Sequence, residues 1–130
     1  MTKGLLAALI LFWTSFAAYG ADPLLGWWRT PTEDHQYGHV EVYPCGADFC
    51  GTVRRGFDDQ DREGTSPFVG REVLSQVQAA GDGTYTGRAY RPKNGKVYDV
   101  VLTLNGPRLE IKGCVAGGLF CSTTSWTRLP

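Results

Sequence analysis

Four cysteines are the residues of this sequence whose type and spacing most directly suggest chemistry: Cys45, Cys50, Cys114 and Cys121. Thiolates spaced like the first pair can bind zinc, and His35 and His39 lie close enough to that pair to complete a four-ligand site. An even number of cysteines in an exported chain instead indicates disulfide bonds. Because the leader described below indicates export, where thiolates do not persist, we predict disulfides and no metal site.

A second candidate is a cluster of carboxylates in the polar segment from Gly56 to Val69, which contains Asp58, Asp59, Asp61 and Glu63. From Asp59 onward, the order Asp-x-Asp-x-Glu-Gly imitates the first half of a calcium-binding loop. The bidentate glutamate that such a loop carries at its twelfth position is replaced here by Gly70. We therefore interpret this segment as a solvated acidic loop.

Acid–base catalysis is a third possibility, because Asp34, His35 and His39 lie close together in the sequence. No serine or cysteine nucleophile stands at a known spacing from them. The glycines precede no helical pattern, so no phosphate-binding loop is indicated. We interpret these three residues as turn and rim residues, and predict no catalytic residue and no cofactor.

The first 20 residues have the organisation of a secretory signal peptide. Lys3 supplies a short positive region, Leu5 to Ala18 form an apolar run too short to span a bilayer, and Ala18-Tyr19-Gly20 is a small-x-small cleavage site. We predict cleavage before Ala21 and an exported protein, either periplasmic or secreted. An amphipathic or buried N-terminal helix is the alternative. Residues 21–130 then form one domain of 110 residues.

The charge of this domain is close to zero. The whole chain has 13 basic and 13 acidic residues, so removing Lys3 leaves 12 and 13, a net charge of −1. There is no basic run, which argues against nucleic acid and anionic membrane surfaces as partners. Nothing after the leader is apolar enough to predict a transmembrane segment, and 110 residues suffice for one modest core.

The segment from Thr84 to Leu104 gives the strongest signal for the elements that must position these residues. Two strand-like runs flank Asn94-Gly95, a dipeptide typical of the two-residue type I′ hairpin turn. Such a loop predicts the facing pairs Lys93–Lys96, Arg91–Tyr98, Ala89–Val100, Gly87–Leu102 and Tyr85–Leu104. One face of the hairpin is then small and apolar. The other face carries Arg88, Tyr90, Asp99 and Thr103, so a slip of one residue would bury charges.

The remaining sequence reads as further short strands joined mostly by tight turns. Including the two strands of the hairpin, eight are predicted, the others being Leu24–Thr30, His39–Pro44, Cys50 to about Arg55, about Gly70–Gln78, Arg108–Lys112, and a last strand ending in Ser125–Arg128. This pattern predicts an all-β fold, either a sandwich or an eight-stranded antiparallel up-and-down barrel. We favour the barrel because closure leaves no edge strand.

Successive turns of a meander alternate between its two ends, and this decides the disulfide pairing. The alternation places Cys45 and Cys50 at one end, and Cys114 and Cys121 at the other. Both cross-paired connectivities would have to span the barrel, beyond the reach of a disulfide. The predicted bonds are therefore Cys45–Cys50 and Cys114–Cys121, each closing a short loop worth about 2 kcal/mol.

The same geometry brings Gly26-x-Trp28 and Arg128 together on the first and last strands. An arginine there can lie across an indole and seal the base of the barrel by stacking. Trp126, two residues earlier, is expected to contribute to this closure. Ordinary core packing of the tryptophans is the alternative.

Nearly the whole domain resembles one known family. The motifs that carry the resemblance are Gly26-x-Trp28, Cys45-x4-Cys50-Gly51, Tyr90-x-Pro92-x-x-Gly95-Lys96-x-Tyr98, Gly113-Cys114 and Trp126-Thr127-Arg128. Their order resembles the exported bacterial family called domain of unknown function 2147. Gly26-x-Trp28 with Arg128 more distantly resembles the lipocalins and other calycin barrels. The resemblance implies a small secreted or periplasmic lipocalin-like protein and no reaction. Cys121 departs from the family pattern, so its disulfide rests on the geometry.

The inward faces of the predicted strands mix small and branched side chains. The small ones are Gly87, Ala89, Gly113, Ser122 and Thr124. An eight-stranded barrel can be filled by its side chains or can hold one small ligand. For so short a chain a filled interior is slightly favoured, and both alternatives stay open.

One end of the barrel is expected to be the working end, because the other is sealed. It comprises Pro31–Gly38, Gly56–Val69, Pro92–Gly95 and Cys114–Cys121, the last with an apolar tip. We predict a non-catalytic binder of a small apolar or amphipathic ligand, bound there by Arg91, Tyr98, Leu119 and Phe120. A protein-binding module, either protease-inhibitor-like or an envelope interaction protein, is the alternative.

Overall fold

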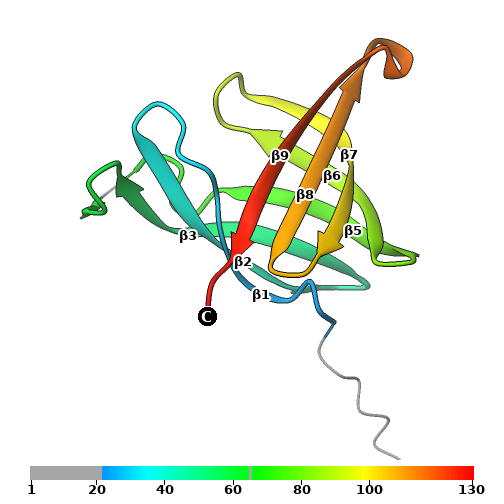
Figure 1. Cartoon of the computed structure of the whole chain (residues 1–130), viewed down its shortest axis with the longest axis horizontal. Coiled ribbons are helices and arrows are strands. Elements are labelled where there is room, and N and C mark those ends of the chain that lie inside the picture. The colour runs from blue at the N-terminus through cyan, green and yellow to red at the C-terminus, as the bar shows by residue number, and fades with distance from the viewer. Residues whose placement is uncertain (1–21, 65) are drawn as a thin grey trace, which may run out of the picture.

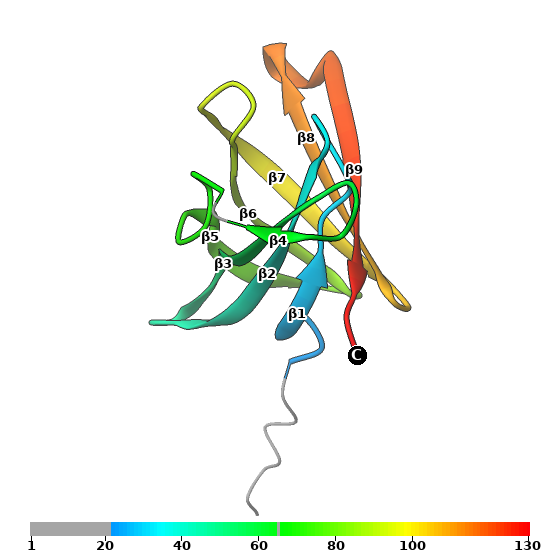
Figure 2. The same ribbon diagram turned by 90° about the vertical axis from the view of Figure 1, so that its left-hand side faces the viewer.

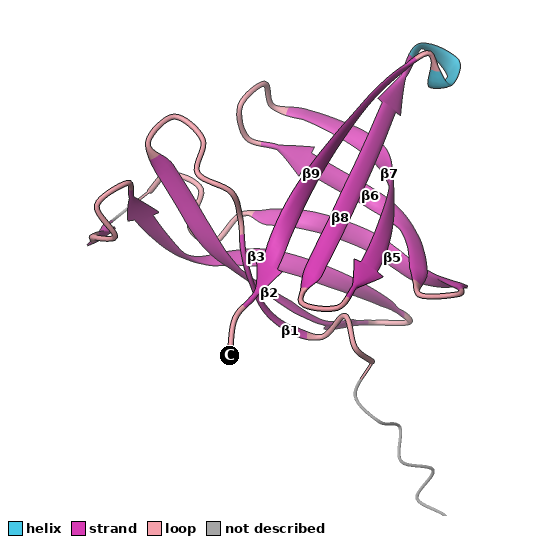
Figure 3. Cartoon of the chain, viewed as in Figure 1, coloured by secondary structure: helices cyan, strands magenta, loops and turns pink. Residues whose placement is uncertain are grey.

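The computed structural model describes residues 22–64 and 66–130, so the predicted leader lies outside the described residues. The described part contains nine strands and one short 3-10 helix (Figures 1 and 3). They are β1 (Gly26–Arg29), β2 (Gln36–Cys45), β3 (Asp48–Asp58), β4 (Glu63–Gly64), β5 (Glu72–Gly81), β6 (Thr84–Arg91), β7 (Lys96–Asn105), β8 (Arg108–Val115), η1 (Ala116–Gly118) and β9 (Phe120–Arg128). No helix in these residues has the length and hydropathy needed to cross a membrane.

Eight of these strands close into one antiparallel barrel. Each pairs with the next along the chain in the order β1, β2, β3, β5, β6, β7, β8, β9, and β9 returns to β1, where Arg128 pairs with Trp28. The ninth, β4, is a two-residue strand that pairs with the end of β3 outside this cycle. The predicted eight-stranded up-and-down barrel is confirmed, and the sandwich alternative is wrong.

The connections gather at two ends of the barrel, which we call the closed end and the open end (Figure 2). The closed end holds the start of β1, the β2–β3, β5–β6 and β7–β8 turns, and the end of β9. The open end holds the β1–β2 connection, the segment between β3 and β5, the β6–β7 loop and the β8–β9 tip with η1. Cys45–Cys50 joins strands at the closed end and Cys114–Cys121 at the open end. Both predicted disulfides are therefore present, and their sulfur atoms are not thiolates available to zinc.

The core lies inside the barrel and is densest toward the closed end. Its buried members alternate along most of the strands, as half-buried sheets require, whereas β5 is irregular and buries the consecutive Val73 and Leu74. The core comprises Leu24, Trp28, Val40, Val42, Val53, Val73, Leu74, Val77, Tyr85, Val100, Leu102, Leu109, Ile111 and Trp126. Leu24 is fully buried, although it precedes β1 rather than belonging to a strand as predicted. Asp22 accepts hydrogen bonds from the Leu24 amide at 2.9 Å and from the Tyr85 hydroxyl at 2.5 Å. The segment before β1 thus plugs the closed end.

Arg128 covers the base of the barrel beside this plug. Its guanidinium carbon lies 4.2 Å from the centroid of the fully buried Trp28 ring. Nη1 donates to the Leu25 carbonyl at 3.1 Å and Nη2 donates to the Pro23 carbonyl. Gly26 has a φ of +120°, and a Cβ there would lie 3.2 Å from Nη1. Glycine therefore serves both the backbone conformation and the close approach of Arg128.

The β6–β7 hairpin differs from its prediction by two residues of register. Arg91 pairs with Lys96 and Ala89 with Tyr98, so Arg91 does not face Tyr98. The loop is Pro92–Gly95, in which the Asn94 and Gly95 amides both donate to the Arg91 carbonyl, at 3.3 and 2.8 Å. Proline after Arg91 favours a type I turn, and a longer loop built on it replaces the type I′ turn. A shift of two residues keeps the alternation of both strands, so Arg88 and Asp99 stay on the outer face. Tyr90, predicted on that face, instead packs against the core and lines the cavity at the open end.

The β2–β3 pair is longer than predicted at the open end. β2 begins at Gln36 rather than His39, and β3 continues to Asp58 rather than Arg55. A register shift lies between His39 and Val40. A bulge of this kind changes the side of the strand to which the following side chains point. The alternation of inward and outward residues is interrupted there, so the sequence pattern does not show that the strand continues. The extension raises a wall on one side of the open end.

Candidate functional site

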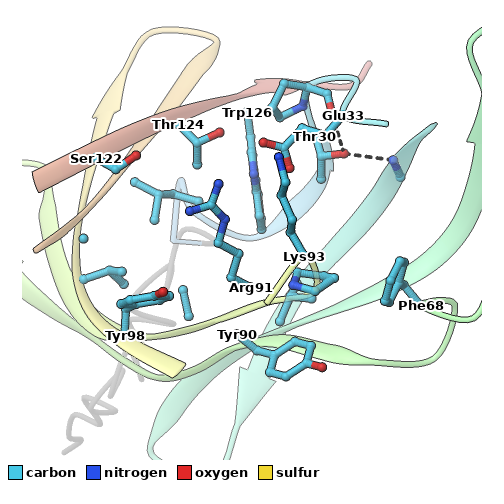
Figure 4. A pocket seen from close by; sticks show the side chains of 18 of the residues that line it. Thr30, Glu33, Phe68, Tyr90, Arg91, Lys93, Tyr98, Ser122, Thr124 and Trp126 are labelled. Atoms are coloured by element: carbon cyan, nitrogen blue, oxygen red, sulfur yellow. Dashed lines mark hydrogen bonds between the residues drawn. The ribbon is translucent and has the colours of Figure 1, made fainter. Parts of the chain in front are cut away.

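The upper half of the barrel is hollow. A cavity of about 610 Å3 opens at the open end and extends down to Trp126, Val100 and Ile111 (Figure 4). Its side walls include Val53 and Val73, which belong to the core. The slight preference for a filled interior is therefore wrong. The volume falls within the range of small-molecule sites.

Small side chains explain why the interior stays open. Ala89, Gly113, Ser122 and Thr124 all line the cavity. A Cβ at Gly113 would make only ordinary contacts, 3.4 Å from Val100 and 3.6 Å from Tyr98, so the space beside it is free. Gly87, also predicted to leave room, does not: a Cβ there would lie 2.8 Å from Val77. Glycine at 87 admits a close neighbour, whereas glycine at 113 leaves volume empty.

The lining is mainly apolar and aromatic below the mouth. Trp126 stands at the floor, and Phe68, Tyr90 and Tyr98 lie around the walls (Figure 4). Tyr98 accepts a hydrogen bond from the Asn94 amide group at 2.7 Å, which fixes its ring beneath the β6–β7 loop. A pocket of this composition with a few polar groups at its mouth is typical of ligand sites.

Two basic side chains, Arg91 and Lys93, cross the mouth from the β6–β7 loop (Figure 4). Arg91 extends toward Ser122 and Thr124 on β9, whereas Lys93 extends toward Thr30 and the rim that carries Glu33. Within the described residues, neither side chain forms an ion pair or hydrogen bond. The mouth therefore presents unpaired cationic donors above an apolar interior.

The four predicted ligand-binding residues are only partly brought together. Arg91, Tyr98 and Phe120 line the cavity, and Leu119 does not. Leu119 is 79% exposed on the outside of the tip, because it follows the η1 turn and so lies outside the alternation of β9. Sequence reasoning missed Lys93 and assigned Trp126 only to closure, although its inward position on β9 could have indicated the floor.

The acidic segment does not converge on one point. Asp58 accepts from the amides of Gln60 and Arg62, both at 2.9 Å, and these bonds lead the causes that lower its pKa. Asp59 contacts His35 at 2.7 Å, Asp61 accepts from the Tyr37 hydroxyl at 2.7 Å, and Glu63 binds Arg55 at 2.6 Å. The carboxylates order the loop between β3 and β4, each through its own partner.

His39 belongs to an aromatic cluster on the outer face rather than to an acid–base pair with His35. Its ring lies 4.5 Å from that of Phe57, which stacks on Tyr37 at 5.1 Å. Burial, and then the charges of Arg55 and Arg29, lower the pKa of His39. The hydrogen bond to Asp61, followed by burial, raises the pKa of Tyr37. Both pKa shifts arise from burial and from neighbouring charges and hydrogen bonds within the cluster. We therefore interpret the cluster as structural.

Comparison with known proteins places this geometry in context. A family model described as "Uncharacterized protein conserved in bacteria (DUF2147)" matches residues 26–128. The solved structure of protein HP1028 from Helicobacter pylori, described as belonging to the lipocalin family, has a TM-score of 0.63 with 23% sequence identity, covering 82% of this chain and 83% of that chain. A search of curated proteins finds no significant match. At this identity the structural likeness establishes the lipocalin-like fold.

Proposed function

We propose that this chain, which belongs to the bacterial DUF2147 family, is an exported, non-catalytic protein that binds a small apolar or amphipathic ligand inside its barrel. The observation that carries the proposal is the cavity of about 610 Å3, sealed at the closed end and open at the other. Its apolar walls would stabilise the apolar part of a ligand by removing it from water. The polar groups at its mouth would orient the polar part of the same ligand.

Export is supported by the cysteines. All four are paired in two disulfides, which form and persist in oxidising compartments. The predicted leader in residues 1–20 points the same way. We place the mature protein, residues 21–130, in the periplasm or outside the cell.

Binding can be tested by filling the cavity. Gly113→Leu adds a side chain into the open space beside Tyr98, at a backbone conformation that leucine tolerates and with only ordinary contacts. N-phenyl-1-naphthylamine, an uncharged apolar probe, should bind the wild type with micromolar to millimolar affinity. Gly113→Leu should reduce that affinity at least about tenfold, or about 1.4 kcal/mol, while stability is kept or rises through burial of the leucine.

Lys112→Leu is the matched control, because it places the same side chain on the outward face of β8 one residue away. It should leave probe binding unchanged. Equal binding by the wild type and a folded Gly113→Leu variant, or no saturable binding by the wild type, would refute the interior site.

A protein partner is the second candidate, and the β8–β9 tip favours it. Val115, Leu119 and Phe120 are 45%, 79% and 67% exposed on a hairpin that projects beyond the barrel and carries the Cys114–Cys121 bond (Figure 1). Exposed apolar clusters of this kind mark contact surfaces. Leu119→Asp separates the two roles, since Leu119 does not line the cavity. A ligand-binding role predicts unchanged probe binding in Leu119→Asp and weaker binding in Phe120→Asp, whereas a partner role predicts loss of co-purification from cell envelopes in Leu119→Asp.

A further inference from the structure

The mouth of the cavity carries a guanidinium without a partner among the described residues. We infer from it that the ligand is a single-chain amphiphile with an anionic headgroup, carboxylate or phosphate, held by Arg91. The inference rests on the proposed ligand-binding function and specifies the class of ligand.

The register of the hairpin sets the side of the strand from which Arg91 projects. It is the last residue of β6, at an inward position of the strand, and its carbonyl accepts the amides of Asn94 and Gly95. The β6–β7 loop is therefore folded back onto the residue that carries the guanidinium. Figure 4 shows the side chain extending across the mouth rather than away from the barrel. An arginine has five donors and no acceptor, so a bound oxyanion is the complementary group.

The groups near Arg91 are hydroxyls that can donate to the same oxyanion. Tyr98 accepts a bond from Asn94, which leaves its own proton to donate. Ser122 and Thr124 project from β9 on the side toward which Arg91 extends (Figure 4). A carboxylate or phosphate placed there can accept from the guanidinium and from hydroxyls together.

The acidic residues of the lining lie elsewhere on the rim. Glu33 and Asp34 belong to the β1–β2 connection, and Lys93, not Arg91, extends toward that side. Lys93 offsets one of the two negative charges on that side. Arg91 extends instead toward β9, whose residues in the cavity lining include no carboxylate. A cationic ligand would have to avoid Arg91 to reach Glu33, so an anionic headgroup is the better match.

The volume limits the rest of the ligand. At about 30 Å3 per non-hydrogen atom, as for water, a cavity of about 610 Å3 holds roughly 20 such atoms. One alkyl chain of moderate length meets this limit, whereas a two-chain phospholipid exceeds it. The apolar floor at Trp126 and Ile111 suits the end of such a chain.

The test compares decanoate, decyl phosphate, decanol and decylamine as competitors of N-phenyl-1-naphthylamine at neutral pH, below their micellar concentrations. Arg91→Gln is compared with Lys96→Gln, which removes the same charge from an exposed residue of the same hairpin that does not line the cavity. At least one of the two anionic probes should bind the wild type about tenfold more tightly than decanol, or by about 1.4 kcal/mol. Arg91→Gln should remove this preference without weakening decanol, and Lys96→Gln should keep it.

The outcomes separate the inference from the function on which it rests. Preference for decanoate alone or decyl phosphate alone supports the inference and identifies the headgroup. Equal binding of all four probes, tighter binding of decylamine, or a preference that survives Arg91→Gln overturns the anionic headgroup and leaves the cavity site standing. Failure of every probe and of N-phenyl-1-naphthylamine to bind overturns both.

Discussion

Replacing Arg128 by alanine should destabilise the barrel more than any loss of surface charge would. Three contacts disappear: the stack on Trp28 at 4.2 Å and the bonds to the carbonyls of Leu25 and Pro23. The stack contributes about 0.5–1 kcal/mol at a partly exposed site. Each hydrogen bond adds about 1 kcal/mol net, because water can replace the guanidinium at these carbonyls. The expected loss in the free energy of unfolding is therefore about 2–3 kcal/mol.

For a domain of this size, such a loss lowers the melting temperature by roughly 8–12 °C. Thermal and urea unfolding of the oxidised protein, followed by circular dichroism, would measure it. Arg108→Ala is the matched control, because Arg108 is exposed at the start of β8 at the same end. Its effect should stay within about 0.5 kcal/mol. Arg128→Lys should recover only part of the loss, since lysine keeps the charge without the planar fork. An Arg128→Ala effect no larger than that of Arg108→Ala would refute the sealing role.

Two further predictions concern Gly26 and His39. Gly26→Ala should cost about 1–3 kcal/mol, because alanine is strained at a φ of +120° and its Cβ would lie 3.2 Å from Arg128 Nη1. In a double-mutant cycle with Arg128→Ala the two losses should add only in part, because the contact with Arg128 is gone while the backbone strain remains. Full additivity would show that the contact with Arg128 carries none of the cost. The pKa of His39 is lowered in the folded protein by burial and by Arg55 and Arg29, whereas the unfolded chain binds the proton near pH 6.5. Stability should therefore fall as the pH drops below about 6.5 and stop falling once the folded His39 is protonated. Urea midpoints between pH 5 and pH 8 should show this step in the wild type and a smaller one in His39→Gln, and equal steps would contradict it.

Much of the architecture follows from patterns that local sequence carries. Alternating side chains identify strands, and in a meander the number of turns between two residues decides which end they share. That counting separates Cys45 and Cys50 from Cys114 and Cys121, and the structure pairs them accordingly. The predicted register of the β6–β7 hairpin is wrong by two residues, yet this error does not change the predicted fold. A shift of two residues changes every cross-strand partner but keeps the alternation of side chains along both strands.

The candidate site was less predictable because it depends on where strands bend and loops fold. Gly87 and Gly113 look alike in the sequence, yet a Cβ at Gly87 would collide with Val77, whereas a Cβ at Gly113 would make only ordinary contacts. Gln76, next to Val77, has a φ of +53° within an irregular part of the β5–β6 pairing. The sequence predicts Leu119 beside Phe120 at the mouth, but the η1 turn between β8 and β9 places Leu119 outside the cavity. Neither the irregular backbone at Gln76 nor the η1 turn before Leu119 has a recognisable signal in the sequence.

The division of the barrel into two halves explains how a cavity can coexist with a stable fold. At the closed end, Leu24 and Trp28 are fully buried, and the Trp28 ring nitrogen donates to the Leu24 carbonyl at 3.0 Å. Arg128 stacks on Trp28 and donates to the Leu25 carbonyl. At the open end, the Cys114–Cys121 bond joins β8 to β9, and Cys121 itself lines the cavity. Arg91 and Lys93 are exposed at the mouth and form no side-chain hydrogen bond or ion pair within the described residues, so they contribute little to stability. Substitutions such as Gly113→Leu and Arg91→Gln can change what the cavity accepts without unfolding the protein, so a loss of binding in them will report on the site itself.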